Sequence, residues 1–281
     1  MQKDEITAAL RDAGTRAAEE LDIAHLAMLM ALYRTPDLQL TVYEDHLRDL
    51  CFLTRARHED LRNAGAEDDV KTQLAALKHV IVDQHGYVGD TEDYDNIANA
   101  DLLAVIERRR GMPVALGVLY LHVAEECGWD IAGINFPSHF LLRLEKDGQR
   151  LIFDPFDTAR PMEAAHLRAL LKKNIGENAE LSAHYYDAVD KRTVILRLQN
   201  NIKLRQVEAA DYESALLTTE LMRLIAPDEF RLLFDYGVLA FKCDMPQKAF
   251  DALQDYAGRT PDARARAEAL VLMEEIKRSI H

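Results

Sequence analysis

The chain has 281 residues and a formal net charge of −14, with 48% apolar and 29% charged residues. This charge disfavours binding to nucleic acid or to an anionic membrane, because both are negatively charged. No apolar run approaches the ~20 residues of a membrane span, and the first residues lack the apolar segment of a signal peptide. Three scattered cysteines indicate neither a disulfide framework nor a zinc site. We therefore expect a soluble, cytoplasmic protein.

Amphipathic helical patterns fill residues 1–82. Apolar residues from Leu21 to Met30 recur close to helical spacing, a second pattern begins at Asp37, and a third runs from Val70 to Val82. Residues 83–100 are rich in Gly, Asp and Asn, which indicates a loop. We expect a helical N-terminal layer followed by this loop.

Two helices and a strand are predicted in the middle of the chain. The first helix covers about 100–110 and ends at Gly111, and the second opens at Pro113, a favoured first-turn residue, and closes at Gly128. The second helix, V-A-L-G-V-L-Y-L-H-V-A-E-E-C, is apolar on nearly every side, which is typical of a buried helix. A strand over 131–136 follows.

Residues 138–156 predict a β-hairpin. Two apolar runs flank Asp147-Gly148, a dipeptide that suits a two-residue type I′ turn. With that turn at the tip, Leu141 faces Asp154, and His139 becomes a diagonal neighbour of Asp154 on one face, within side-chain reach. An imidazole that is oriented by a carboxylate is two thirds of a catalytic triad.

Residues 193–281 are helical by pattern and contain a repeat. Ala215 and Ala249 are 34 positions apart, as are Pro227 and Pro261, and this is the period of tetratricopeptide (TPR) repeats. The last stretch fits a capping helix. Two repeats fall short of the three that are usually needed for independent stability, so we expect the repeats to pack on the rest of the protein.

The order of buried helix, strand and hairpin resembles the core of the transglutaminase-like fold, which papain-like proteases share. Within it, three motifs and an upstream loop resemble the SirB family of transglutaminase-like proteins, and the TPR tail is typical of its bacterial members. The segments are G-Y-V-G-D-T-E-D-Y-D-N at 86–96, I-E-R-R-R-G-M-P-V-A-L-G-V-L-Y at 106–120, N-F-P-S-H-F-L-L-R at 135–143 and F-D-P-F-D at 153–157.

The resemblance and the patterns together predict an α+β fold with two parts. Residues 1–192 form a transglutaminase-like domain that includes the helical N-terminal layer, with its papain-like core at about 84–160. Residues 193–281 form TPR-like helical repeats with a capping helix.

The resemblance also implies where a nucleophile belongs. In transglutaminase-like enzymes a cysteine starts the buried helix, where the helix N-terminus lowers its pKa. Here Pro113, Val114 and Ala115 occupy that place, with no Cys, Ser or Thr nearby. The SirB family generally lacks this cysteine and has serines in the helix start, where this chain has Ala115 and Gly117.

None of the three cysteines is predicted to replace the missing nucleophile. Cys127 lies at the opposite end of the buried helix, roughly 20 Å away, where the helix dipole raises the pKa of a thiol. Cys51 and Cys243 belong to the flanking helical regions. His139 and Asp154 then remain as a vestigial triad.

These observations favour a non-catalytic, bacterial pseudoenzyme that binds a protein or peptide, through a cleft at His139 or through the TPR-like tail. The alternative is a hydrolase or amide-transfer enzyme in which His139 acts as general base on water and Asp154 orients it. A third possibility is a scaffold whose only site is the TPR groove. An enzyme requires His139 to reach solvent, whereas a structural pair would be sealed. We expect no cofactor and no metal, because spacing suggests no third ligand.

Candidate binding residues lie in the same motifs. For the three arginines at 108–110, the alternative role is to complement a helix C-terminus and to form ion pairs with the acidic loop at 90–95, one of them a buried Arg–Asp clamp. The candidates are Tyr94, Arg109, Arg110 and Asn135.

Overall fold

The computed structural model describes residues 1–280, with side chains through Arg278, and the chain divides into two compact units. The first unit comprises residues 18–198. The second comprises residues 2–17 together with the chain from Gln199 onward. The sequence placed residues 2–17 in the N-terminal domain and set the boundary after residue 192, so the observed division differs at both points.

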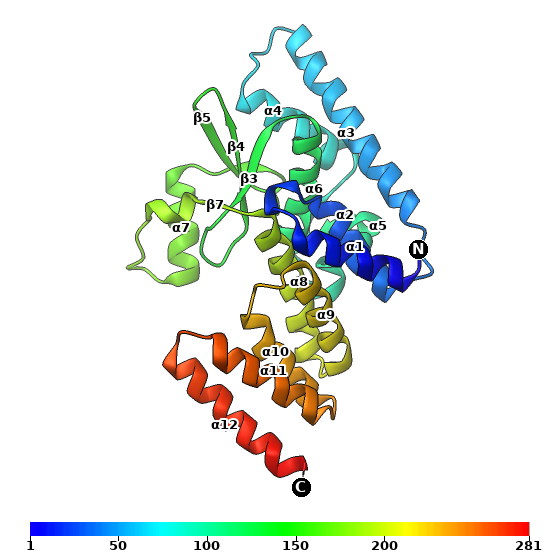
Figure 1. Cartoon of the computed structure of the whole chain (residues 1–281). Helices are drawn as coiled ribbons and strands as arrows, with labels where there is room; N and C mark the ends of the chain where they lie inside the picture. Colours follow the sequence, from blue (N-terminus) through cyan, green and yellow to red (C-terminus); the bar gives the residue numbers. More distant parts are fainter. Residues whose placement is uncertain (281) are drawn as a thin grey trace. The chain divides into compact units, whose positions relative to one another are not determined.

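Helices make up most of the first unit (Figure 1). The three amphipathic patterns predicted within residues 1–82 are helical, and the loop predicted at 83–100 contains only short elements. The helices are α2 (Ile23–Arg34), α3 (Leu40–Asn63), α4 (Val70–Lys78) with the π-helix η2 (His79–Gln84) directly after it, α5 (Leu102–Arg108), α6 (Pro113–Glu126) and α7 (Ala164–Ile175), with 3₁₀ turns at η1 (Ala18–Glu20), η3 (Ile97–Asn99) and η4 (Ala183–Tyr186).

An antiparallel sheet with the strand order β6-β5-β4-β3-β7 lies against these helices. The predicted hairpin is confirmed, since Leu142 pairs with Phe153 and Lys146 with Gln149, and both turn residues have positive φ. The strands are β3 (Asp130–Ile134), β4 (Leu141–Lys146), β5 (Gln149–Asp154), β6 (Arg160–Pro161) and β7 (Ala188–Val189), and a separate parallel pair joins β1 (Val88–Gly89) to β2 (Arg110–Gly111).

The central helix α6 is buried along almost its whole length, as its sequence predicts. It begins with Pro113 in its first turn and is followed by Gly128 at φ 75°, so both predicted ends are confirmed. One side of α6 packs on β3 and β4, and α2 and α3 pack on it from the sequence-distant N-terminal layer (Figure 1). On the sheet, α7 packs Leu167 and Leu171 against Leu141, whose neighbours in β4 point to the opposite face.

The prediction that a helix extends over 100–110 was wrong at its end. Helix α5 stops at Arg108, because Arg109 adopts the left-handed conformation with φ 59°. The next two residues leave the helix and pair with β1 as strand β2. The backbone N–H of Val88 donates to the carbonyl of Arg109 at 3.0 Å, so this loop is fixed to β1 by hydrogen bonds.

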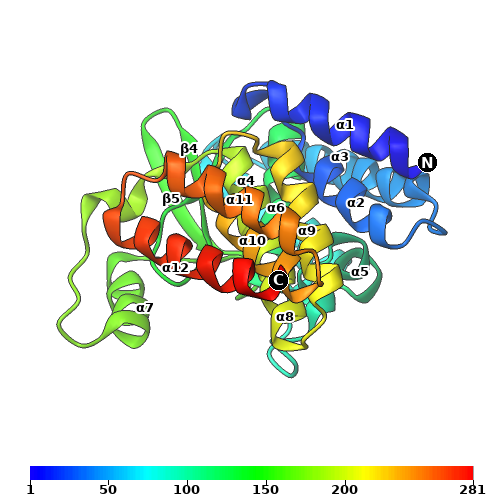
Figure 2. The ribbon, with the colours of Figure 1, turned by 60° about the horizontal axis from the view of Figure 1, so that its bottom comes forward.

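The second unit is entirely helical in the residues that the structure describes (Figure 2). Helix α1 buries Ile6, Leu10 and Ala13 and packs on α9, which explains why it groups with the C-terminal helices. Within residues 1–280, no helix combines the length and apolar character that crossing a membrane requires. The helices of this unit are α1 (Lys3–Thr15), the end of α8 (Lys191–Glu208), α9 (Tyr212–Ile225), α10 (Arg231–Lys242), α11 (Pro246–Arg259) and α12 (Ala263–Ile280).

Candidate functional site

The structure brings His139 and Asp154 into direct contact. Nε2 of His139 lies 2.8 Å from Oδ2 of Asp154, and Oδ1 of the same carboxylate accepts the backbone N–H of Phe156 at 2.9 Å. The two side chains are 16% and 10% exposed. The pair is therefore mostly buried, with partial access to solvent. One detail of the prediction was wrong, because β4 begins at Leu141 and His139 lies in the loop before it.

Two glycines shape the wall beside this pair. Phe140, which follows His139, packs its ring between Gly117 of α6 and Gly133 of β3. A Cβ atom at Gly133 would lie 2.8 Å from Cζ of that ring, and one at Gly117 would overlap it. The absence of side chains at these two positions therefore lets β4 approach the first turns of α6.

Backbone strain surrounds the pair. Ser138, Thr158 and Ala159 all have positive φ, at 58°, 49° and 56°, although none of them is glycine. Such conformations cost energy and persist only where the surrounding structure imposes them, and they concentrate at functional sites. These segments directly precede His139 and closely follow Asp154, so the strain is localised at the site.

At the predicted nucleophile position, the first turn of α6 presents only apolar side chains. Pro113, Val114 and Ala115 are all buried. This turn is fixed by η3, because the backbone N–H of Met112 donates to the carbonyl of Asn99 at 2.9 Å. The geometry of the start of α6 is thus maintained, while its side chains offer neither a thiol nor a hydroxyl group.

The acidic loop is fixed in turn by Arg108. Its guanidinium donates to Oδ2 of Asp90 at 2.9 Å and to Oδ1 of Asn99 at 2.8 Å, and Asp90 is only 2% exposed. This is the buried Arg–Asp clamp that the sequence suggested. Arg110 lies 2.8 Å from Glu92 and 3.9 Å from Asp90, so it too is engaged with the loop.

Of the four candidate binding residues, Tyr94 is connected to the pair through Phe156. Its ring is 46% exposed and meets the ring of Phe156 edge-on at 5.7 Å, and the N–H of Phe156 donates to Asp154. Asn135 lies at the end of β3 and accepts a hydrogen bond from Arg197 at 2.9 Å.

Arg109 belongs to a different cluster. Its guanidinium carbon lies 4.7 Å above the ring centroid of Tyr87, it hydrogen-bonds the hydroxyl of Tyr87, and its Nη1 lies 2.6 Å from Nε2 of His46. Burial, with the charge of Arg109, lowers the pKa of His46 to about 4, so this histidine is neutral at physiological pH. The side chain of Arg109 therefore packs beside β1, against Tyr87 and His46.

Comparison with known proteins identifies the family. The pattern of the Transglutaminase-like superfamily matches residues 41–200. A UPF0162 protein of Vibrio cholerae is 30% identical over 197 residues, which cover 70% of this chain and 73% of that protein. The chain belongs to the transglutaminase-like superfamily and to the UPF0162 family. The SirB resemblance remains a prediction.

Other relatives extend the similarity. A UPF0162 protein of Xylella fastidiosa is 27% identical over 242 residues, 85% of this chain and 84% of that protein. F-box only protein 21 of Mus musculus is 32% identical over 185 residues, 63% of this chain but only 29% of its own length. A crystal structure of menin covers 95% of this chain and 73% of its own, at 10% identity and a TM-score of 0.41, which is too low to carry an argument.

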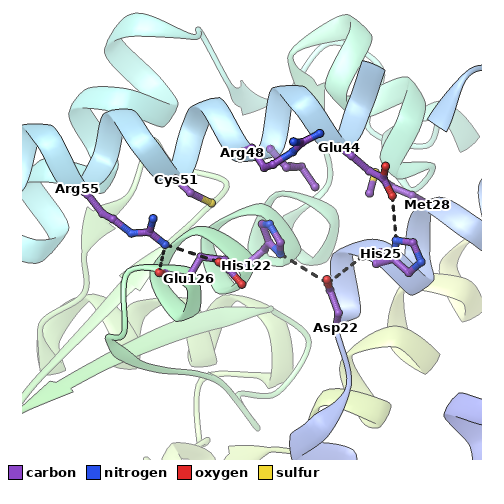
Figure 3. A pocket seen from close by; sticks show the side chains of 10 residues that line it. Asp22, His25, Met28, Glu44, Arg48, Cys51, Arg55, His122 and Glu126 are labelled. Carbon is purple, nitrogen blue, oxygen red and sulfur yellow. Dashed lines mark hydrogen bonds and ion pairs between the residues drawn. The ribbon is translucent and has the colours of Figure 1, made fainter. Parts of the chain in front are cut away.

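Sequence reasoning missed a second group of polar side chains in the transglutaminase-like unit. A pocket of about 540 Å³ is lined by residues of α2, α3 and α6, with Asp22 preceding α2 (Figure 3). Nδ1 of His122 lies 3.6 Å from Oδ1 of Asp22, and the pair lies beside Cys51. The available signal was His122, a lone histidine in an otherwise apolar helical run. No group of three metal-ligating side chains able to hold a metal ion occurs among residues 1–280.

This pair predicts a pH dependence of stability. Burial alone would lower the pKa of His122, but hydrogen bonds and charge from Asp22 and Cys51 outweigh it and raise the pKa to about 10. Because the folded value is raised, the stabilisation is fully present below the ordinary pKa of histidine and is lost as the pH rises through about 10. His122→Gln is therefore expected to lower the free energy of unfolding most at about pH 6, and the deficit should shrink towards pH 10.

Urea unfolding of both proteins across this pH range measures the difference. Burial also opposes the charge on Asp22, but hydrogen bonds from His122 and from the N–H of His25 lower its pKa to about 2. The stabilisation that the charged Asp22 contributes is therefore lost only as the pH falls through about 2. A His122→Gln deficit that is constant between about pH 6 and pH 10 would contradict a charged histidine.

Proposed function

We propose that this chain binds a protein or peptide segment at the surface around His139 and Asp154 and does not cut or join it. The observation that carries the proposal is the combination of an intact His–Asp contact with a helix start that has no nucleophile. Covalent catalysis of acyl transfer requires a thiol or hydroxyl beside the base. The retained pair can still donate and accept hydrogen bonds to a peptide.

The surroundings of the pair suit a peptide ligand. Tyr94 supplies an exposed aromatic ring, and such rings are enriched at sites that bind proteins. The first N–H groups of a helix have no partner within the helix, so the Val114 and Ala115 amides at the start of α6 are suited to a peptide carbonyl. The strained segments at Ser138 and Thr158 keep the loops on either side of the pair in one conformation.

One observation favours the alternative, a hydrolase that activates water. His139 is 16% exposed, so its ring is not sealed, and Asp154 orients it. A general base on water needs these two features and no protein nucleophile. This alternative predicts turnover that depends on His139, whereas the binding proposal predicts none.

We also propose that the C-terminal helices are TPR-like repeats that present a second binding surface. Ala215 and Ala249, one period apart, are fully buried. Gly237 of α10 packs so closely on α11 that a Cβ atom would lie 2.6 Å from Cγ of Leu253, as expected for the small residue of a repeat. The helices α9, α10, α11 and α12 pack in sequence order, as in a repeat stack (Figure 2).

The proposal is tested by two measurements on the same four proteins: wild type, His139→Ala, Asp154→Asn and Tyr94→Ala. In an assay that joins a fluorescent amine to peptide glutamine, and in an amide-hydrolysis assay, all four are expected to equal the buffer blank. In selection from a displayed random-peptide library, wild type is expected to enrich a common motif. The three variants should bind those peptides at least about tenfold more weakly, which corresponds to ~1.4 kcal/mol.

Tyr94→Ala separates lost binding from misfolding in this set, because Tyr94 is exposed and its replacement removes a surface side chain and neither member of the His–Asp pair. Turnover by wild type that disappears in His139→Ala would replace the proposal by the hydrolase. Enriched peptides that bind all four proteins equally would place the binding surface elsewhere, and truncated proteins without α10 to α12 would then test the TPR-like tail.

A further inference from the structure

Cys51 lies near the middle of α3 with its side chain directed into the pocket beside His122 (Figure 3). The residue is 4% exposed and lines the pocket. His122 projects from α6 and contacts both the thiol and Asp22. A thiol, an imidazole and a carboxylate from three separate elements therefore meet in a cavity of about 540 Å³, within the usual ~300–1,000 Å³ range of small-molecule sites.

We propose that Cys51, His122 and Asp22 form a reactive-thiol site that exchanges with small peptide disulfides of the oxidised glutathione type. The thiolate is the nucleophile in such chemistry, and a protonated imidazole beside it stabilises that form. Asp22 holds His122 in the protonated state. The site is independent of His139 and Asp154, which lie on the sheet side of α6.

The other cysteines lack these features. Cys127 lies close by, with its sulfur 3.9 Å from the carbonyl oxygen of Cys51, but burial, with Cys51 nearby, raises its pKa to about 11. Burial also raises the pKa of Cys243, which lies in the second unit. Neither thiol has an imidazole partner among the interactions that shift its pKa. They serve as internal controls within the same molecule.

The surroundings favour disulfide exchange over acyl transfer. Acyl transfer requires N–H donors aimed at the developing oxyanion, and those of catalytic cysteines usually come from a helix N-terminus. Cys51 is in the interior of α3, where backbone N–H groups are used by the helix itself. Exchange needs only a thiol that can lose its proton and an acid for the departing sulfur, and the site places the Cys51 thiol beside the imidazole of His122.

The charges of the pocket suit a zwitterionic peptide. Three cationic groups line it (Arg48, Arg55 and His122), and three carboxylates face them (Asp22, Glu44 and Glu126). Several of these groups pair with one another, as His122 does with Asp22 and Arg55 with Glu126, so the wall presents charges of both signs. A glutathionyl group, with its carboxylates and ammonium, also carries both signs. The side chains of Met28 and Leu47 give the pocket an apolar portion.

The reaction is balanced without another reagent. The Cys51 thiol releases a proton to solvent, and its thiolate attacks one sulfur of the small disulfide. A new Cys51–sulfur bond forms as the original sulfur–sulfur bond breaks. The departing thiolate takes the proton of His122, which recovers a proton from solvent. Cys51 is oxidised to a mixed disulfide, and the released half is reduced to a thiol.

The test is incubation of the full chain with oxidised glutathione, followed by intact mass measurement and non-reducing peptide mapping. We expect one glutathionyl group on Cys51, added at least about tenfold faster than on Cys127 or Cys243. Cys51→Ser should abolish this adduct and Cys127→Ser should leave its rate unchanged. His122→Gln and Asp22→Asn should each slow it at least about tenfold.

Asp22→Asn is the matched variant, because asparagine still accepts the N–H of His25 at the start of α2 while the charge is removed. If the His122→Gln protein does not fold, the rate measured for Asp22→Asn still tests whether the charged pair accelerates exchange at Cys51. Equal rates at the three cysteines in wild type, or an unchanged rate in a folded Asp22→Asn protein, would overturn the proposal.

Discussion

Replacing Gly117 by valine is expected to lower the free energy of unfolding by about 3 kcal/mol or more, because it overfills a closed space. A side chain at Gly117 would overlap the ring of Phe140, and the ring cannot move away because Gly133 already limits it on the other side. The resulting strain at Phe140 would be transmitted to His139, which directly precedes Phe140 in the chain. Urea unfolding measures the loss, and near-UV circular dichroism reports whether the aromatic packing survives.

Gly258 provides the control for this experiment. It also lies in a helix, α11, but a Cβ atom there has nothing within 4 Å. Gly258→Ala is therefore expected to be neutral or to stabilise by up to ~1 kcal/mol, because alanine favours helix. Gly117→Ala would gain the same propensity and should still destabilise. A Gly117→Val protein as stable as wild type would show that Phe140 is not confined.

Arg108→Ala is expected to cost about 2–4 kcal/mol, because it leaves a buried carboxylate without its main cationic partner. Burial opposes the charge on Asp90, but the N–H of Asp93 and the guanidinium of Arg108 outweigh it and lower the pKa of Asp90. Since the folded value is depressed, this stabilisation is present at neutral pH and is lost as the pH falls through it. The loss of unfolding free energy caused by Arg108→Ala should therefore become smaller at acid pH.

Two variants separate charge from geometry at this clamp. Arg108→Lys keeps the charge but cannot reach Asp90 and Asn99 together, so we expect an intermediate loss. Arg110→Ala should cost less than Arg108→Ala, since Arg110 is more exposed and lies 3.9 Å from Asp90. The measurement is chemical unfolding at neutral and acid pH. Equal losses for Arg108→Ala and Arg110→Ala would contradict the assignment of Arg108 as the clamp.

The parts of the fold that depend on local chemistry could be predicted. Asp147-Gly148 determines the turn and therefore the hairpin register, and this register predicts that His139 lies beside Asp154. Pro113 and Gly128 likewise mark the ends of α6.

Features that depend on tertiary contacts could not be predicted. The left-handed turn at Arg109 follows from the pairing of the next residues with β1, which involves only two residues on each strand. Asp22, Cys51 and His122 come from three elements with no common spacing, so no pattern in the sequence connects them. A lone histidine in an apolar helix was the one local sign of that pocket.

Helix α1 has a consequence for how the chain is assembled during synthesis. Its apolar residues Ile6, Leu10 and Ala13 are covered by α9, which the ribosome makes some two hundred residues later. In the sequence, the whole transglutaminase-like unit lies between α1 and the rest of the helical unit. The entropic cost of closing a loop grows only slowly with loop length. The large sequence separation between α1 and α9 therefore affects the folding rate more than the final stability. The core of the second unit is therefore completed only after α9 has been made.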